Sequence, residues 1–392
     1  MKHITALILP LAFSALAAGN VQAFETQADH AIILDYETGA VLYSYESEAP
    51  MVPASMTKIM TAYMVFERLS DGRLSPEDTF TVSERAWREG GWASGGSTMG
   101  LAIGQEVSVA DLLHGMIVQS GNDACIVLAE GISGSEEAFA DLMSARAQEL
   151  GLETAHFENA TGLFAEGHEI SAHDLARLAQ MTIENFPNYY RIYNVRDFEW
   201  NGISQPNRNP LLYRFNGADG LKTGHLSQSG YGVVGSAEVD GVRRIIVLNG
   251  MESETARAAE SERMMRAAFR EFSLSEPFAD GAEVGMVPVW LGSSDHVSAI
   301  IREDVVIAYE SASRNDLSAD LIVPDVLSAP VSEGDEIGTL EIRNGAEVIG
   351  SFPVYAGSDV SRTGLLSRAI SGVSALISPG SSEAPSEASG ES

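Results

Sequence analysis

The stretch Pro53-Ala54-Ser55-Met56-Thr57-Lys58 opens an apolar run that continues to Leu69. Apolar residues in this run cover nearly every face of a helix, which is typical of a helix buried in a protein core. If Ser55 begins the helix, its side chain and that of Lys58 lie one turn apart on the same face. A free serine is a poor nucleophile and needs an adjacent base, and a lysine becomes that base when burial and positive neighbours lower its pKa. The run therefore predicts a serine nucleophile activated by the lysine three residues later. The S-x-x-K spacing taken alone is common by chance.

Strand patterns lie on both sides of a helical region. Residues 31–35 and 40–45 predict a hairpin before it. Helical patterns cover residues 55–69, 109–130, 136–150 and 172–183. Strand patterns return at 217–222, 231–238 and 242–249, and a helix is predicted over 255–272. One sheet with helices packed on it accounts for that order.

The two ends of the chain differ from its body. Residues 1–23 combine a polar start, an apolar run and a small-residue cleavage site, so they predict a secretory signal peptide; an uncleaved anchor is the alternative. From residue 276 to 358, short strand patterns separated by turns predict a small all-β domain that follows a main domain over 24–275. Residues 361–378 have the apolar spacing of an amphipathic helix, which either lies on a membrane surface or docks on its own domain. Residues 379–392 are predicted to be a disordered acidic tail.

Composition narrows the classes of partner. The chain has 55 Asp and Glu residues against 24 Lys and Arg, a net charge of −31, and a single cysteine. This balance argues against nucleic-acid binding, because phosphates need clustered basic residues, and against broad electrostatic adhesion to anionic lipid. Cys125 has no second cysteine with which to form an internal disulfide, and in an exported protein we expect it to be buried and inert.

Ser120-Gly121-Asn122 is a second candidate motif. It lies between two apolar stretches, so it predicts a tight loop that joins two buried helices. Ser120 could relay a proton there, while Asn122 could donate to a substrate carbonyl and accept from an amide. The alternative interpretation is a helix cap, since serine and asparagine both favour caps.

Lys222-Thr223-Gly224 is the third motif, at the end of a predicted edge strand and followed by His225. Lys222 offers a positive charge, Thr223 offers a hydroxyl, and Gly224 lets a ligand backbone come close to the strand. The alternative interpretation is a turn into the next strand.

The three motifs occur in the order S-x-x-K, S-x-N and K-T-G, each on the element that the chemistry needs. In this order they resemble the serine penicillin-recognising enzymes. The neighbouring residues are similar to those of the low-molecular-mass penicillin-binding proteins that are D-alanyl-D-alanine carboxypeptidases. The resemblance covers residues 28–272 strongly and the rest of the chain more loosely. It implies an α/β penicilloyl-serine-transferase domain, with an antiparallel sheet and a helical insert, followed by a small all-β domain.

The resemblance also implies a role for each motif residue. Ser55 attacks the bond between two D-alanines, Lys58 takes its proton, and Ser120, bridging to Lys222, passes a proton to the leaving D-alanine. Asn122 holds the substrate amide, and the backbone N–H groups of Ser55 and His225 form the oxyanion hole.

A carboxypeptidase also needs to bind a free carboxylate. Thr223 is one candidate for that contact. Asn207-Arg208-Asn209 resembles the family segment that carries a carboxylate-binding arginine, with Arg214 as the fallback.

The resemblance further implies peptidoglycan stem peptides as substrates and β-lactam antibiotics as inhibitors. It implies an exported, periplasmic protein, peripheral on the inner membrane through the helix at 361–378. We expect no cofactor and no metal. The G-x-G-x-x-G match at Gly230–Gly235 falls inside a predicted strand, and His168 and His173 are five residues apart rather than the four that a zinc helix needs.

Three other functions remain open from the sequence. A β-lactamase is disfavoured, because the segment that would activate water is absent and Phe157-Glu158-Asn159 has the wrong spacing. A DD-endopeptidase of the same family and a non-catalytic penicillin-binding envelope protein are the other two. We assign Thr161 no catalytic role, and we expect the Gly- and Ser-rich residues 90–104 to form a mobile rim over the pocket.

Overall fold

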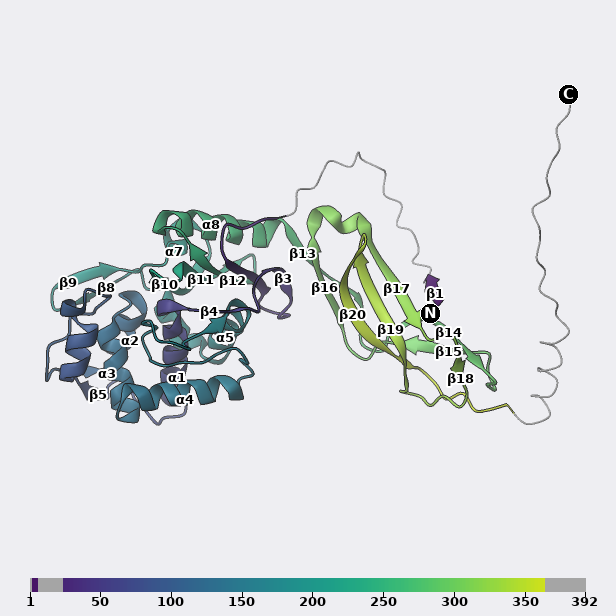
Figure 1. The fold of residues 1–392 in the computed structure, drawn as a ribbon, viewed down its shortest axis with the longest axis horizontal. Helices are drawn as coiled ribbons and strands as arrows, with labels where there is room; N and C mark the ends of the chain where they lie inside the picture. The colour runs from purple at the N-terminus through teal and green to yellow at the C-terminus, as the bar shows by residue number, and fades with distance from the viewer. Residues whose placement is uncertain (1, 6–23, 364–392) are drawn as a thin grey trace, which may run out of the picture. The chain divides into compact units, whose positions relative to one another are not determined.

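The computed structural model describes residues 2–5 and 24–363 (Figure 1). Its described residues fall into two compact units. One comprises residues 24–274 with Ala308–Ala312, and the other comprises residues 2–5, Ser275–Ile307 and 313–363. All three candidate motifs belong to the first unit.

A five-stranded antiparallel sheet forms the centre of the first unit, in the order β10-β11-β12-β2-β3. Its strands are β2 (His30–Asp35), β3 (Val41–Tyr45), β10 (Ala218–Leu226), β11 (Gly230–Val239) and β12 (Val242–Met251). The predicted hairpin at β2 and β3 is confirmed. Strand β10, which carries the K-T-G motif, lies at one edge of the sheet, so its outer edge is open to a ligand.

Helices cover both faces of this sheet. Alternate residues of β2 enter different cores, because successive strand side chains point to opposite faces. Ile32 and Leu34 belong to the core that contains α1 (Lys58–Ser70) and α5 (Ala172–Asn185). Ala31 and Ile33 belong to the core under α8 (Glu254–Arg270).

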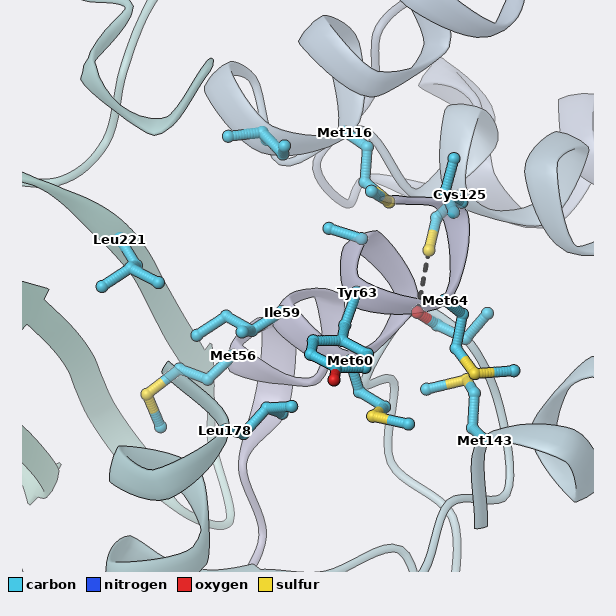
Figure 2. Packing of buried hydrophobic residues seen from close by; sticks show 14 of the residues in the cluster. Met56, Ile59, Met60, Tyr63, Met64, Met116, Cys125, Met143, Leu178 and Leu221 are labelled. Atoms are coloured by element: carbon cyan, nitrogen blue, oxygen red, sulfur yellow. Dashed lines mark hydrogen bonds between the residues drawn. The ribbon is translucent and has the colours of Figure 1, made fainter. Parts of the chain in front are cut away.

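Helix α1 is buried on nearly all sides, as its apolar pattern predicts. Figure 2 shows Ile59, Met60, Tyr63 and Met64 projecting from it in different directions, with Leu221 of β10 on one side and Cys125 on another. The surrounding helices are α2 (Val109–Val118), α3 (Asn122–Ser133) and α4 (Glu136–Glu149). Lys58, the first residue of α1, is therefore held by the centre of the core.

Two predicted helices differ from the structure. The helix expected from Ser55 begins at Lys58, and residues Ala54–Thr57 form a separate 3₁₀ turn, η1. The helix expected over 109–130 is broken at the Ser120 motif into α2 and α3, as the loop interpretation of that motif requires. A hairpin of β8 (Asp197–Trp200) and β9 (Ile203–Pro206) was not predicted.

The second unit contains a seven-stranded sheet in the order β1-β17-β19-β20-β15-β14-β18. Its strands are β1 (Lys2–Thr5), β14 (Glu283–Trp290), β15 (His296–Ile300), β17 (Leu317–Val323), β18 (Leu327–Ser328), β19 (Glu336–Asn344) and β20 (Glu347–Ala356). The predicted β character of this region is confirmed.

Several predicted features lie mainly outside residues 2–5 and 24–363. Most of the predicted signal peptide (1–23) lies there, and so do most of the predicted amphipathic helix (361–378) and all of the predicted acidic tail (379–392). Within residues 2–5 and 24–363, no helix is both long and apolar enough to cross a bilayer.

Candidate active site

The turn that carries Ser55 is a strained piece of backbone. Ala54, immediately before it, has a φ of +51°, a left-handed conformation that costs a non-glycine residue on the order of 1–3 kcal/mol. The 3₁₀ turn places Ser55 and Lys58 three residues apart, where side chains of such a turn eclipse each other. As a result, the Lys58 Nζ donates a hydrogen bond of 3.0 Å to the Ser55 Oγ.

Lys58 is fully buried and makes three hydrogen bonds. Besides Ser55, its Nζ donates to the Asn122 Oδ1 at 2.7 Å and to the Thr161 carbonyl at 2.6 Å. Burial, together with the positive charge of Arg208, lowers the pKa of Lys58 to about 8. A substantial fraction of this lysine is therefore neutral near physiological pH, which a proton acceptor for the serine needs to be. Thr161 contributes its backbone carbonyl to this set of bonds.

The second serine is linked to the second lysine. Ser120 lies in the break between α2 and α3 with a φ of +62°, and its Oγ accepts a hydrogen bond of 2.9 Å from the Lys222 Nζ. Lys222 is buried, and its burial and the nearby charge of Lys58 hold its pKa well below the usual lysine value. A serine and a lysine from segments 102 residues apart thus form a hydrogen-bonded pair.

Strand β10 forms one wall of the site. A side chain at Gly224 would bring its Cβ within 2.7 Å of the Pro53 carbonyl, so glycine is required where this strand passes the nucleophile turn. The next residue, His225, stacks its ring on Tyr231, with the centroids 3.8 Å apart. The backbone of the K-T-G motif is consequently held against the start of η1.

These groups meet at a cavity of about 520 Å³. The predicted residues that line it are Ser55, Ser120, Asn122, Arg208, Thr223, Gly224 and His225. Lys58 and Lys222 lie beneath the lining, bonded to the two serines. The structure therefore brings together every residue that the three motifs singled out.

The two candidate carboxylate-binding arginines are separated by the structure. Arg208 lines the cavity and donates to the Oγ of Ser97, which also lines it. Arg214 does not line it; its guanidinium lies 3.8 Å from the Glu262 carboxylate, beside a neighbouring groove. This placement favours Arg208 over Arg214 as the carboxylate-binding residue.

A sequence-family model of D-alanyl-D-alanine carboxypeptidases matches residues 17–253, more than half of the chain. The chain belongs to the D-alanyl-D-alanine carboxypeptidase family. A second model, the C-terminal domain of penicillin-binding protein 5, matches residues 272–362. Both matches confirm the resemblance that the three motifs indicate.

Relatives of known name support the same assignment over most of the chain. The D-alanyl-D-alanine carboxypeptidase DacA of Escherichia coli K12 is 35% identical over 333 residues, which cover 84% of this chain and 83% of DacA. The crystal structure of the carboxypeptidase DacD from Francisella tularensis matches with a TM-score of 0.78 and 30% identity, covering 90% of this chain and 98% of DacD. Penicillin-binding protein 5 from Haemophilus influenzae matches with a TM-score of 0.68 and 33% identity, covering 87% and 100% respectively. The predicted fold class is confirmed, and this member of the carboxypeptidase family is a hydrolase.

One supporting residue was missed by the sequence reasoning. Asp123, buried directly after the S-x-N motif, accepts hydrogen bonds from the backbone N–H groups of Met99, Gly100 and Leu101 and from the Thr98 hydroxyl, at 2.6–3.0 Å. This carboxylate fixes part of the 90–104 segment, which contributes Gly95, Gly96 and Ser97 to the cavity rim. An acidic residue beside a catalytic loop and facing a glycine-rich stretch was the available signal.

A second missed group lies on α8. Arg257 is buried, lines the cavity and packs over the Tyr231 ring at 5.5 Å, while its Nε has no hydrogen-bond partner. The helical pattern of α8 places Arg257 on its inner face, but only the fold brings that face to the cavity.

Proposed function

We propose that this chain is a serine carboxypeptidase that removes the terminal D-alanine from peptidoglycan stem pentapeptides through an acyl-enzyme on Ser55. The observation that carries the proposal is the hydrogen bond of 3.0 Å from Lys58 to Ser55, at the same cavity as the bond of 2.9 Å from Lys222 to Ser120. Membership of the carboxypeptidase family supports the substrate class.

The proposed acylation step uses both serine–lysine pairs. Neutral Lys58 takes the hydroxyl proton of Ser55 while the Oγ attacks the carbonyl between the two D-alanines. When the tetrahedral intermediate collapses, the C–N bond breaks and Ser120 passes a proton to the departing amine, replaced from Lys222. Water then attacks the ester of Ser55, and the proton it loses restores Lys222 through Ser120. The ester C–O bond breaks, the Ser55 Oγ takes back its proton from Lys58, and the shortened peptide leaves with its new carboxylate.

The proposed substrate contacts follow from the same geometry. The backbone N–H groups of Ser55 and His225 would stabilise the oxyanion, where losing one donor typically lowers the rate roughly 10²–10³-fold. The Oδ1 of Asn122 accepts from Lys58, so its Nδ2 is directed toward the cavity rim, where a Cβ on Gly96 would lie 3.0 Å away. That amide would donate to the substrate backbone.

Arg208 is proposed to bind the free carboxylate, together with the Thr223 hydroxyl. We expect Arg208→Ala to lower kcat/KM for a D-Ala-D-Ala peptide about 100-fold, because the substrate carboxylate loses a charge-assisted hydrogen bond. Acylation by benzylpenicillin should fall less. Steady-state kinetics on both compounds measure the difference, with Arg214→Ala as the matched control outside the cavity. Equal losses for peptide and penicillin would refute the assignment.

A β-lactamase needs a carboxylate placed to activate water for fast hydrolysis of the penicilloyl ester. Of the cavity-lining residues that the structure describes, Glu254 alone carries a carboxylate, and it lies 3.3 Å from the Arg257 guanidinium. Glu158, from the segment considered in the sequence, pairs with His156 at 2.9 Å and does not line the cavity. We therefore infer that penicillin would leave a long-lived acyl-enzyme.

One experiment separates the candidate functions. The purified protein is incubated with benzylpenicillin and, separately, with a D-Ala-D-Ala-ended stem peptide, and both the protein mass and released D-alanine are followed. A persistent adduct together with D-alanine release supports the proposal. Rapid penicillin turnover would favour a β-lactamase, and neither adduct nor release would favour a non-catalytic envelope protein. A third incubation with a cross-linked stem-peptide dimer tests the endopeptidase, which hydrolysis of the dimer without D-alanine release from the stem peptide would favour.

The cellular location is part of the proposal. We propose that residues 1–23 direct export to the periplasm, that 24–275 and 276–358 act as catalytic and β domains, and that 361–378 hold the protein on the inner membrane. The amphipathic spacing of apolar residues in 361–378 supports the last point. Deleting 361–392 should move the protein from the membrane to the soluble fraction on cell fractionation. An unchanged membrane fraction would remove the anchor from this account.

A further inference from the structure

A buried histidine contacts the nucleophile turn from outside the three motifs. His168 is 1% exposed, and its Nε2 lies 2.8 Å from the Oγ1 of Thr57, which stands between Ser55 and Lys58. Its Nδ1 lies 3.1 Å from the backbone N–H of Glu158. This histidine belongs to the apparent zinc motif of the sequence, and the mechanism proposed above does not use it.

The two hydrogen bonds fix the protonation state and tautomer of the His168 ring. A backbone N–H can only donate, so the Nδ1 facing Glu158 must carry a lone pair. A neutral imidazole has one N–H group. Its hydrogen therefore resides on Nε2, which donates to the Thr57 hydroxyl. Burial agrees with this neutral tautomer, because it lowers the pKa of His168 to about 4. The ring also packs against Phe157, with the centroids 5.6 Å apart.

His168 stands at the closing end of a loop that covers the nucleophile turn. A pair of backbone hydrogen bonds between His156 and Glu169, of 2.8 and 2.9 Å, closes this loop. At its middle, Gly162 presses on the turn so closely that a Cβ there would collide with the Ala54 carbonyl. The loop therefore reaches the residue before Ser55 and, through Thr161 and His168, the two residues that end the motif.

The turn needs this support because its own backbone does not favour the conformation. Ala54 has a φ of +51°, and η1 has no side-chain cap. A non-glycine residue in the left-handed region persists only where the surroundings hold it. The bond from His168 to Thr57 joins two side chains, whereas Thr161 bonds to Lys58 through its backbone carbonyl.

We propose that His168 is a positioning residue, whose Nε2–H bond to Thr57 holds the strained turn so that Ser55 faces both Lys58 and the substrate carbonyl. It touches no reacting atom and acts through Thr57. The inference rests on the proposed function, because it concerns the rate at which Ser55 is acylated. A misplacement of about 1 Å in such a group can lower a rate up to 100-fold.

Two substitutions of His168 each keep one of its two hydrogen bonds and remove the other. The amide nitrogen of glutamine can take the place of Nε2, so H168Q keeps the donor to Thr57. The amide oxygen of asparagine can take the place of Nδ1, so H168N keeps the acceptor for Glu158 and loses the bond to the turn. T57V removes the same bond from the other side with little change in shape. H156Q alters the exposed histidine of the same loop and is the matched control.

The experiment measures acylation of the full chain by benzylpenicillin over a range of concentrations, which separates the acylation rate constant from the affinity of the initial complex. We expect H168N and T57V to lower the rate constant about tenfold or more with affinity unchanged, H168Q to stay within about threefold of wild type, and H156Q to match it. Thermal unfolding identifies any variant that does not fold. If H168N does not fold, T57V still tests the same hydrogen bond.

The outcomes are distinguishable from failure of the proposed function. If the wild-type protein is not acylated, the proposed function falls and this inference falls with it. If the wild type is acylated and T57V and H168N react as fast, or lose affinity rather than rate, the positioning role alone is wrong.

Discussion

Replacing Ser55 with alanine should abolish both D-alanine release and acylation by penicillin. Alanine leaves Lys58 and the cavity in place but removes the oxygen that forms the acyl-enzyme, so no covalent path remains. We expect kcat for a stem pentapeptide to fall at least about 10⁴-fold, since nucleophile deletions in serine hydrolases cost on that order or more. Release of D-alanine, followed by a coupled oxidase assay, measures the loss.

The control for this change is Ser204→Ala, an exposed serine of β9 that does not line the cavity. It should keep the wild-type rate. Thermal unfolding of Ser55→Ala should stay close to wild type, because Ser55 is only partly buried. A Ser55→Ala protein that retained half of its activity would rule out the proposed nucleophile.

Acylation should depend on pH through Lys58. The lysine acts as a base only when neutral, and burial lowers its pKa to about 8, so kcat/KM should rise with pH and level off above that value. At pH 6 about 1% of the lysine is neutral, which predicts a rate about 100-fold below the plateau. The second-order rate constant of penicillin acylation, measured between pH 5.5 and 9.5, gives this rising limb of the pH profile.

A variant assigns the limb to Lys58 rather than to Lys222, whose pKa is also lowered by burial. Lys58→Arg keeps the positive charge and removes the base, since a guanidinium stays protonated throughout this range. The rate should fall roughly 10²–10⁴-fold and the limb near pH 8 should vanish. A variant that retained both the rate and the limb would show that another group accepts the proton.

Much of the site could be predicted from the sequence because its chemistry lies in short segments. Ser55 with Lys58, Ser120 with Asn122, and Lys222 with Thr223 are each close in the chain, and their residue types limit what they can do. The strand and helix patterns around them were strong enough to predict a sheet edge for the third motif and a break between helices for the second. Burial of Cys125 also followed, and its Sγ donates to the Ala160 carbonyl at 2.8 Å.

What was missed depends on contacts between distant segments. The left-handed φ of Ala54 and the 3₁₀ form of the Ser55 turn are imposed by the packed loop, because an alanine has no intrinsic preference for that conformation. The roles of Asp123, Arg257 and His168 likewise depend on partners that the fold supplies. From the sequence, His168 was set aside as a metal ligand because of its spacing to His173, and it was assigned no other role. In the structure its ring bonds to Thr57 and to the Glu158 backbone.

The position of the penicillin adduct shows which residue is the nucleophile. The protein is treated with benzylpenicillin, digested, and mapped by tandem mass spectrometry. The account predicts one adduct, with the mass of the intact antibiotic, on the peptide that contains Ser55 and on the Ser55 side chain itself. An adduct on Ser120 or any other residue, with Ser55 unmodified, would contradict it.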